Sequence, residues 1–487
     1  MAAMESGWFA FDRWDERVGD GLEALLRRHH RRRLSRLGWR QTLEAPTDGS
    51  WWSPRAPVRS GNQIEVLIDG ASALAAMEKA IGEARESVHI AGWHATPDFK
   101  LTRGPDAPSL RDLLAAVAER VPVRLLLWAG PPLPAFEPTR RMVKAAREEF
   151  IRDSRVECAL DSRERTLHCH HEKIVIIDGT VAFVGGIDFT ALQGDRHDEQ
   201  VHPPRGPLGW HDAAVRLLGP AVADVADHFG QRWNDVTGER LPAAAAPAAA
   251  GESEVQVLRT VPEKTYDFSP RGEFTILDAY LRVLRLAERF IYLENQFLWS
   301  PEVVDVLAER LENPPCDDFR VVLVLPTKPS NGADTTRGQL GRLTDADGDA
   351  GRLLATTISA NGGDEQASVY VHAKIAIVDD RWLTIGSANL NEHSLFNDTE
   401  MNVSTCDAAL ARATRLRLWA EHTERPVEAV DAEPCSVIEE IWRPTAEEQA
   451  RLDKAGLPRT HRLTLLPSVS RRTHRLEGPM RGLLVDG

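Results

Sequence analysis

The sequence predicts an α/β protein made of two similar lobes. Three observations indicate this: strand-like and helix-like segments alternate from residue 61 onward, the same order of segments returns after a low-complexity stretch, and one short motif occurs in each half. Such alternation is typical of a layered sheet with helices on its faces. We therefore expect lobes at residues 61–240 and 253–425, joined by an Ala/Pro-rich linker at residues 241–252.

The expected elements follow from hydrophobic periodicity. Short apolar or alternating runs predict strands, and amphipathic stretches of 12 residues or more predict helices. The expected strands include residues 64–69, 88–93 and 123–128 in the first half and 291–297 and 319–326 in the second half. Helices are expected at residues 71–87, 110–121 and 279–290.

Composition narrows the class of protein. With 59 Lys and Arg against 73 Asp and Glu, the formal net charge is −14, which argues weakly against a nucleic-acid partner. The 42% hydrophobic content is enough for a full core. The sequence contains no run of 18 apolar residues, so no membrane-spanning helix is expected. Five scattered cysteines predict neither a disulfide framework nor a zinc site. The start of the chain lacks the pattern of a signal peptide, so we expect a cytoplasmic monomer.

Two terminal segments flank the expected lobes. Residues 1–60 contain a basic stretch, Arg27 to Arg40, preceded by leucines. A helix of this kind could lie on an anionic membrane surface, or it could be a solvated helix packed through its leucines. Residues 426–487 contain short apolar runs, so this tail is expected to pack on the second lobe.

The motif HxKxxxxD is the clearest sign of a duplication. In each copy the Lys follows the His by two residues, the Asp follows it by seven and a Gly follows it by fourteen. The two copies begin at His171 and His372, and both continue into a strand and a helix that ends near a Trp. One copy would be weak evidence, but two copies in matching surroundings predict a duplicated α/β domain.

The repeated residues suggest chemistry on a phosphate ester. His171 and Lys173 are two positions apart on a strand and share a face, as do His372 and Lys374. A pseudo-two-fold arrangement would bring two histidines and two cations together. One His can attack phosphorus while the other moves protons, and the lysines can stabilise charge on the non-bridging oxygens.

Further residues are expected around this pair. A catalytic His needs an orienting carboxylate, and the spacing suggests Asp198, 27 residues after His171, and Glu400, 28 after His372. Gly186 would allow close backbone approach, and Ser387 and Asn389 could donate hydrogen bonds to phosphate.

Other polar residues allow more than one interpretation. Asp178 and Asp379 belong to the motif and are counted with the catalytic residues, although at strand ends they could bind backbone amides instead. No role follows from spacing for Asp188, His211 or Asp212. His168, Cys169, His170 and His171 would alternate in direction along an extended chain, so no metal site is expected there.

The motifs together resemble a known family. HHEKIVIIDG, GGIDF, IYLENQFLWSP and GSANLNEHS are similar to motifs of the phospholipase D superfamily, especially its eukaryotic-type branch. The resemblance implies a two-lobed α/β/α fold with one active site at the lobe interface. It also implies hydrolysis of glycerophospholipids such as phosphatidylcholine to phosphatidic acid, or transfer to alcohols, without a metal or other cofactor. By resemblance His171 would be the nucleophile, His372 the general acid and base, and Lys173, Lys374 and Asn389 the phosphate ligands.

Alternatives remain open at this stage. A nuclease or another phosphodiesterase of the same superfamily would use the same histidines, and an inactive lipid-binding scaffold would not need them intact. The expected partner is a phospholipid at a membrane surface rather than a nucleic acid. The polar, Gly-rich tract from Asn331 to Arg352 could form a rim of the site or a solvated insertion.

Overall fold

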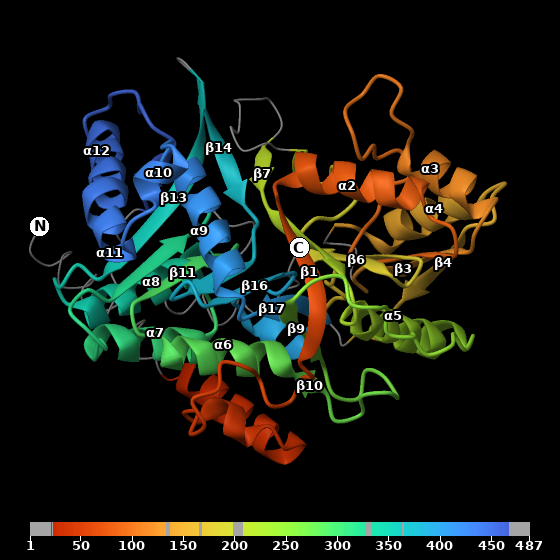
Figure 1. Cartoon of the computed structure of the whole chain (residues 1–487), viewed down its shortest axis with the longest axis horizontal. Coiled ribbons are helices and arrows are strands. Elements are labelled where there is room, and N and C mark those ends of the chain that lie inside the picture. Colours follow the sequence, from red (N-terminus) through yellow and green to blue (C-terminus); the bar gives the residue numbers. More distant parts are fainter. Residues whose placement is uncertain are drawn as a thin grey trace, which may run out of the picture.

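Two α/β lobes lie side by side in the computed structural model (Figure 1). The structure describes residues 21, 23–132, 137–164, 168–197, 208–327, 333–362 and 365–466. Each lobe contains a mixed sheet with helices on both faces, as the alternating sequence pattern predicts.

The sheet of the first lobe has seven strands in the order β4–β3–β2–β5–β6–β8–β1. β2, β3 and β4 are parallel, and the other neighbours are antiparallel. The strands are β1 (Arg59–Ile68), β2 (Val88–Gly92), β3 (Val123–Trp128), β4 (Glu157–Asp161), β5 (Ile174–Ile177), β6 (Val181–Gly185) and β8 (Ala213–Leu218). β5 is buried along its whole length, as a central strand covered on both faces must be.

The second sheet repeats this order as β13–β12–β11–β15–β16–β17–β9. Its strands are β9 (Ser253–Val261), β11 (Phe290–Glu294), β12 (Arg320–Val324), β13 (Leu353–Gly362), β15 (Ile375–Val378), β16 (Trp382–Gly386) and β17 (Glu400–Thr405). The pairing Val88 with Ile177 corresponds to Ile291 with Val378. The duplication expected from the sequence is therefore present strand by strand.

Strand pairing also connects the lobes. β1 pairs antiparallel with β9 at Arg59–Val255 and Asn62–Ser253. A second contact joins β7 (Gly209–His211) in parallel to β14 (Glu365–Val371), which forms a hairpin with β13. Two short strands complete the set: β10 (Glu273–Phe274) pairs with β9, and β18 (Leu463–Leu465) pairs with β13.

Helices cover both faces of the two sheets (Figure 1). In the first lobe α2 (Gly70–Gly82), α3 (Leu110–Ala118) and α4 (Arg140–Ile151) lie on one face and α5 (Val222–Thr237) on the other. The second lobe has α6 (Thr275–Leu286), α7 (Pro301–Glu312) and α8 (Ala333–Asp347) on one side and α9 (Ala408–His422) on the other. One apolar core includes α5, α9 and strands of both sheets, so it is continuous across the interface.

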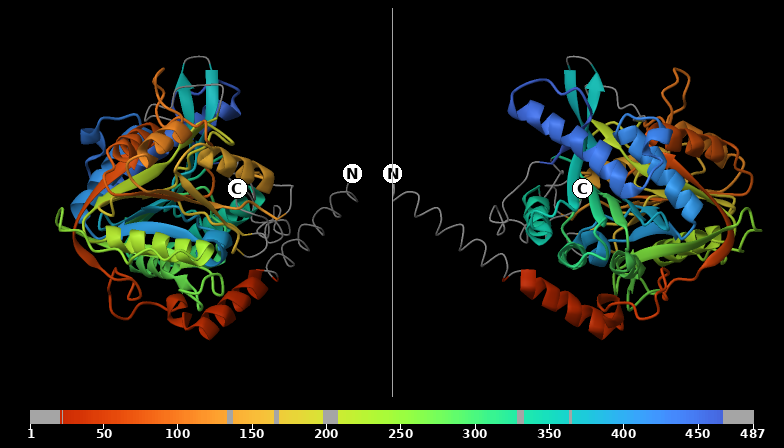
Figure 2. Two further views of the ribbon diagram at one scale, coloured as in Figure 1. Left: turned by 90° about the vertical axis from the view of Figure 1, so that its right-hand side faces the viewer. Right: turned by 60° about the vertical axis from the view of Figure 1, so that its left-hand side comes forward.

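A helix over residues 23–37 precedes the first lobe and continues to the turn η1 (Arg40–Leu43). Figure 2 shows it at the opposite end of the molecule from the β13–β14 hairpin. Arg33 is buried and pairs with Glu263 at 2.6 Å, and the ring of His30 stacks on Phe396 at 4.0 Å. Leu34 is fully buried, so the helix packs against the second lobe while one face stays exposed.

The segments after the second motif add short helices. These are η2 (His393–Asn397), α10 (Val427–Val430), α11 (Pro434–Val437), η3 (Ile438–Trp442) and α12 (Arg443–Lys454). Trp442 is fully buried against Tyr292 and Trp419, so the tail packs on the second lobe up to β18. No helix within the described residues is both long and apolar enough to cross a lipid bilayer.

The interpretation of Asn331 to Arg352 as a solvated insertion is wrong for most of that tract, whereas its role as a rim of the site stays a prediction. Its residues from Ala333 to Asp347 form α8, which packs on α7. Thr336 accepts a hydrogen bond from the Trp299 indole at 2.8 Å, and Leu343 is fully buried. The glycines and polar residues concealed a helix whose leucines, Leu340 and Leu343, face the core.

Candidate functional site

The two motif histidines enter the structure just before the central strands β5 and β15. The amide of His171 donates to the carbonyl oxygen of Thr399 at 2.9 Å, and the amide of His372 donates to that of His211 at 2.8 Å. Each motif is thus held by the backbone of the other lobe. Both histidines are buried, with 5% of the surface of each exposed.

The carboxylates that orient the histidines also come from the opposite lobe. Nδ1 of His171 lies 2.9 Å from Oε1 of Glu400, and Nδ1 of His372 lies 2.6 Å from Oδ2 of Asp212. An Nδ1–H that donates to the carboxylate leaves Nε2 of each ring with a lone pair for chemistry. The arrangement is reciprocal across the pseudo-two-fold axis.

This geometry corrects the sequence-based assignment of the acids. Glu400 does orient a histidine, but the one in the first motif. Asp198 lies outside the described residues, and the position equivalent to Glu400 in the first lobe is Asp212, because Ala214 pairs with Gly185 as Asn402 pairs with Gly386. The first repeat has 13 more residues than the second between motif and acid, so equal spacing pointed to the wrong residue.

Hydroxyl groups support one of the two carboxylates. Ser387 donates through Oγ to Glu400, and Ser394 donates to the same carboxylate at 2.5 Å. Ser387 was expected to bind substrate, but in this structure its hydroxyl serves Glu400. At the equivalent position in the first lobe, a Cβ on Gly186 would lie 2.2 Å from Oδ1 of Asp212. Gly186 is therefore needed to leave room for Asp212.

The two lysines are held in similar but unequal ways. Lys173 donates to the carbonyl oxygen of His171 at 2.7 Å and pairs with Asp188 at 3.0 Å. Lys374 donates to the carbonyl oxygen of His372, and its Nζ lies 3.3 Å from Oε1 of Gln296. Both lysine side chains are buried, and each ammonium group is held at the backbone of its own motif histidine.

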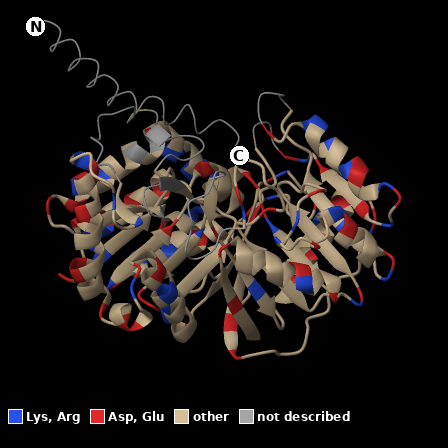
Figure 3. Ribbon diagram, turned by 90° about the horizontal axis from the view of Figure 1, so that it is seen from above, with Lys and Arg blue, Asp and Glu red and all other residues tan. Residues whose placement is uncertain are grey.

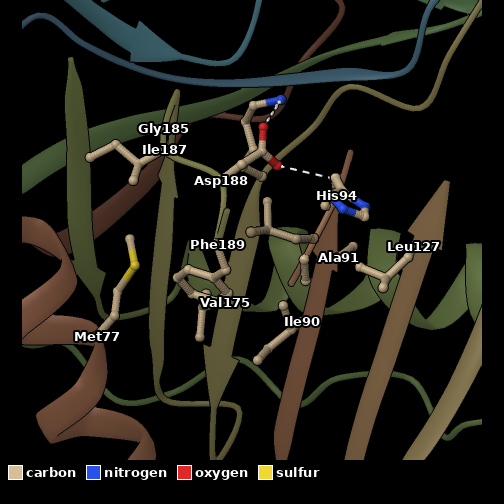
Figure 4. A pocket seen from close by; sticks show the side chains of 14 residues that line it. Met77, Ile90, Ala91, His94, Leu127, Val175, Gly185, Ile187, Asp188 and Phe189 are labelled. Carbon is tan, nitrogen blue, oxygen red and sulfur yellow. Dashed lines mark hydrogen bonds and ion pairs between the residues drawn. The ribbon is translucent and has the colours of Figure 1, made fainter. Parts of the chain in front are cut away.

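Asp188 and Asn389 mark the difference between the lobes. They occupy equivalent positions, three residues after the paired glycines Gly185 and Gly386. Asn389 donates to Gln296 at 3.3 Å, so it lies beside Lys374 as the sequence suggested. Figure 4 shows Asp188 and His94 at the rim of a second, largely apolar pocket.

Burial and nearby cations set the protonation of His372. Burial, followed by the positive charges of Lys374 and Arg196, holds the pKa of His372 well below its ordinary value. Burial raises the pKa of Asp212 to about 7, although Lys374 partly opposes this. At neutral pH His372 is therefore a neutral imidazole with a free Nε2.

A cavity joins the two histidines. It is lined by Trp93, His171, Asp188, Gln193, Arg196, Trp210, Gln296 and His372. The Trp210 and His372 rings lie 4.3 Å apart between centroids, so the indole forms one wall beside the second histidine. Two bases and buried cations around one cavity suit a phosphodiester anion.

The motif aspartates lie away from this cavity, which corrects their placement among the catalytic residues. Asp178 accepts hydrogen bonds from the amides of Arg85, Glu86 and Ser87. Asp379 accepts in the same way from Glu288, Arg289 and Phe290. Both follow the far ends of β5 and β15, at φ of 54° and 55°, a left-handed conformation that Asp tolerates. They fix the turns before β2 and β11.

Two other sequence motifs meet behind the site. Glu294, in IYLENQF, accepts hydrogen bonds from His211 at 2.8 Å and from His422 at 3.0 Å. His211 also contacts Asp69 at 2.9 Å, and its pKa is raised well above the ordinary value, mainly by Asp69 and Glu294 acting against burial. This network holds His211, whose carbonyl oxygen anchors His372.

The histidines before the first motif have separate partners. Nδ1 of His170 lies 2.9 Å from Oγ1 of Thr399, and Nδ1 of His168 lies 3.1 Å from Nδ1 of His393. His171 turns to Glu400, so these side chains diverge as the extended-chain argument predicts. His168, His393 and Asp398 are close enough together to hold a metal ion, but this set does not include either motif histidine.

Sequence reasoning missed three residues of the site. Asp212 and Gln296 lay inside quoted motifs without a role, and Arg196 was not considered. Their signal in the sequence was weak. A loop of variable length precedes Asp212, and Gln296 follows a strand with no unusual sequence feature. Only the strand register places them beside His372 and Lys374.

Comparisons with known proteins agree with this arrangement. Residues 80–205 match the family model described as "Phospholipase D", and residues 280–419 match "Cardiolipin synthase, PLD-like domain". Phospholipase D A of Dictyostelium discoideum is 27% identical over 76% of this chain and 36% of its own length. Phospholipase D2 of Bos taurus is 25% identical over 82% of this chain and 57% of its own length. The chain thus spans between about one third and three fifths of the length of these relatives.

A solved structure shares the fold. The phosphatidylserine synthase of Haemophilus influenzae Rd KW20 superposes with a TM-score of 0.51 over 82% of this chain and 95% of that one, at 12% identity. With both family models covering the two motif regions, and with two reciprocal His–carboxylate pairs at the lobe interface, the chain belongs to the phospholipase D superfamily.

Proposed function

We propose that this protein is a phospholipase D that hydrolyses glycerophospholipids such as phosphatidylcholine to phosphatidic acid, and that transfers the phosphatidyl group to alcohols. The observation that carries the proposal is that His171 and His372 line one cavity, and that two of its other lining residues, Asp188 and Gln296, contact the buried Lys173 and Lys374. The similarity to curated phospholipases over most of this chain supports the choice of a phosphodiester substrate.

The first step forms a covalent intermediate. Binding of the phosphodiester anion offsets the neighbouring positive charges, so the otherwise neutral His372 takes up a proton at Nε2. Nε2 of His171 then attacks phosphorus, the bond from phosphorus to the headgroup oxygen breaks, and the proton on Nε2 of His372 goes to that oxygen. Glu400 stabilises the ring of His171 as it becomes cationic, through Nδ1–H. Lys173 and Lys374 stabilise charge on the two non-bridging oxygens.

The second step returns the enzyme to its starting state. His372, now neutral, takes a proton from water or an alcohol, whose oxygen attacks phosphorus. The bond from phosphorus to His171 breaks, and phosphatidic acid or its ester leaves. Burial and the neighbouring cations lower the pKa of His372, so its Nε2 is unprotonated and can accept this proton, which it releases when the product leaves.

An exposed row of arginines supports a membrane-surface substrate. Arg28, Arg31, Arg32 and Arg36 are exposed on helix 23–37 and form no ion pair in the described part of the chain. Leu25, 60% exposed, precedes them on the same helix. Elsewhere basic and acidic positions are interspersed over both lobes (Figure 3). We take this row to bring a cytoplasmic monomer peripherally to anionic lipid.

The function is tested with phosphatidylcholine vesicles, ethanol and EDTA, and phosphatidylethanol is read by mass spectrometry. Wild type should form it, and His171→Ala and His372→Ala should each abolish it. His461→Ala, at a histidine that contacts Thr423 away from the cavity, should keep the wild-type rate. Turnover of single-stranded DNA but of no lipid would instead favour a nuclease of the same superfamily.

The membrane contact is tested by replacing the four arginines with Gln. Each should contribute about 1 kcal/mol near an anionic surface, so sedimentation with phosphatidylglycerol vesicles should fall more than tenfold. Turnover of monomeric short-chain lipid should stay unchanged. A matched set of exposed arginines, Arg85, Arg155, Arg240 and Arg425, provides the control. Equal vesicle binding by both quadruple variants would refute the membrane role of the helix.

A further inference from the structure

Arg196 is unusual among the buried arginines. Within the described residues five arginines are at least 95% buried: Arg33, Arg196, Arg232, Arg415 and Arg462. Four of them pair with carboxylates, at distances that reach 3.5 Å for Arg462 with Glu424. Within the described part of the chain Arg196 forms no ion pair; its Nη1 donates to the carbonyl oxygen of Gly194 at 3.3 Å, and its Nε has no hydrogen-bond partner there. Because a buried, unpaired cation is costly, its retention indicates a ligand.

The guanidinium group lies in the wall of the catalytic cavity. Arg196 lines this cavity together with His171 and His372. Its Cζ lies 3.1 Å from the centroid of the Trp210 ring, and Trp210 in turn contacts His372. Burial lowers the pKa of Arg196 to about 10, so the group is still cationic at neutral pH. The cation is therefore beside the second histidine.

The backbone around Arg196 is fixed rather than free. A Cβ on Gly70, at the start of α2, would lie 1.4 Å from the carbonyl oxygen of Arg196. The adjacent Asp195 binds the amide of His197 at 2.9 Å and pairs with Arg103. Such close packing holds the arginine in place before substrate arrives.

The second lobe has no counterpart. Between Asn389 and Glu400, the stretch equivalent to the one that carries Arg196, the sequence contains neither Arg nor Lys. The two lysines already provide a symmetric pair of cations for the two non-bridging oxygens. Arg196 thus adds positive charge on one side only, so the two ends of a diester meet different environments.

We propose that Arg196 binds an anionic group on the leaving headgroup, a carboxylate or a second phosphate, and so selects acidic phospholipids over phosphatidylcholine. The proposal rests on the proposed function, in which His372 protonates the headgroup oxygen and the headgroup therefore lies near Arg196. A quaternary ammonium group binds to the open face of an aromatic ring. The guanidinium group of Arg196 already covers one face of the Trp210 ring, so that face is not open to a quaternary ammonium group.

The test compares dihexanoyl phosphatidylserine with dihexanoyl phosphatidylcholine as monomers, so that surface charge has no influence. Wild type should have the higher kcat/KM on phosphatidylserine. Arg196→Gln should lower that value about 10- to 100-fold, the range for a hydrogen-bonded charge, and should change the value for phosphatidylcholine less than threefold. Arg196→Lys should recover part of the loss, because it restores charge without the planar fork.

Two outcomes would overturn the assignment. Equal losses on both lipids would place Arg196 at the scissile phosphate, and no loss on either would make it structural. The melting temperature of Arg196→Gln should not fall, because the substitution removes an unpaired buried charge. A lower melting temperature would also indicate a structural role.

A binding measurement separates this inference from the proposed function. Calorimetry on His171→Asn should show tighter binding of glycerophosphoserine than of glycerophosphocholine, and Arg196→Gln in that background should remove the difference. This arm does not need turnover. If no lipid is hydrolysed but the binding preference is present, the proposed function fails and the Arg196 assignment stands. Equal binding of both compounds would overturn the assignment.

Discussion

The carboxylate of Glu400 lies 2.9 Å from Nδ1 of His171, although 229 residues separate them in the chain. The pair of His372 and Asp212 mirrors this contact in the opposite direction. Each lobe therefore supplies a histidine to one pair and a carboxylate to the other. The interface between the lobes is part of the chemistry and not only of the architecture.

The crossed pairs predict that Asp212→Asn and Glu400→Gln each disable the histidine of the other repeat. The amide cannot stabilise a cationic ring, so kcat should fall about 10²- to 10⁴-fold with little change in stability. Activity on short-chain lipid and thermal unfolding measure the two effects. Asp198→Asn is the informative control: full activity is expected, and a loss as large as that of Asp212→Asn would restore the spacing-based assignment.

Replacement of His171 and replacement of His372 should have different effects on the reaction. With His372→Ala a phosphatidylated His171 should accumulate, because the base that activates water in the second step is lost, and turnover should slow about 10²- to 10⁴-fold. With His171→Ala no covalent intermediate should form. Peptide mass spectrometry after rapid acid-free quenching identifies the modified residue. Phosphorylation at His372 in the His171→Ala variant would reverse the proposed roles.

The motif aspartates should matter for stability and not for the chemical step. Asp178→Ala and Asp379→Ala each leave three backbone amides without their acceptor, which should cost about 1–3 kcal/mol. Urea unfolding measures the loss, and kcat per folded molecule should stay within about threefold. A large fall in kcat at unchanged stability would return these residues to the catalytic set.

The Glu294 network predicts a defined pH dependence of stability. Pairing with His211 and His422 holds the pKa of Glu294 below its ordinary 4.5 despite burial, so this contribution is present above pH 4.5 and is lost as acid protonates the folded state. The pKa of His211 is raised above 6.5, so its contribution is present below pH 6.5 and is lost as pH rises through the higher folded value.

Glu294→Gln should therefore destabilise the protein most between about pH 4.5 and 6.5, by about 1–3 kcal/mol, because it removes one of the two carboxylates that the buried His211 cation contacts. Urea unfolding of both proteins from pH 4 to 9 gives the difference curve. A difference that is constant across this range would contradict the pairing.

Anion binding should be linked to proton uptake at His372. The free imidazole is neutral because burial and Lys374 lower its pKa, and a bound phosphodiester anion cancels part of the positive charge. The pKa of His372 then rises, so affinity should increase as pH falls. Calorimetry with diethyl phosphate in buffers of different ionisation enthalpy measures the uptake, which His372→Gln should remove. Unchanged uptake in that variant would assign the proton elsewhere.

Much of the fold could be predicted because its signals are local or repeated. The alternation of apolar runs indicates the strands, and the recurrence of HxKxxxxD indicates the duplication, which the strand order reproduces. Helix α8 could not be recognised, because its glycines lower helix propensity and only tertiary packing of Leu340 and Leu343 stabilises it.

Only the site residues that belong to the HxKxxxxD motif could be predicted from the sequence. The histidines and lysines follow from a two-residue spacing on a strand, which requires no knowledge of the loops. Arg196 lies in a stretch whose length differs between the repeats, and Asp212 follows that stretch, so counting residues failed there. Contacts between lobes depend on strand register, which a single sequence does not specify.

The crossed contacts also have a consequence for biosynthesis. His171 leaves the ribosome 229 residues before Glu400, a delay of roughly 10–50 seconds at ordinary rates of synthesis. During that time the first lobe holds His171 without its carboxylate and Asp212 without its histidine. Under the proposed function, the nascent chain cannot cleave lipid until the last strands of the second sheet join the first. Activity would then begin only after the second lobe has been synthesised and has folded against the first.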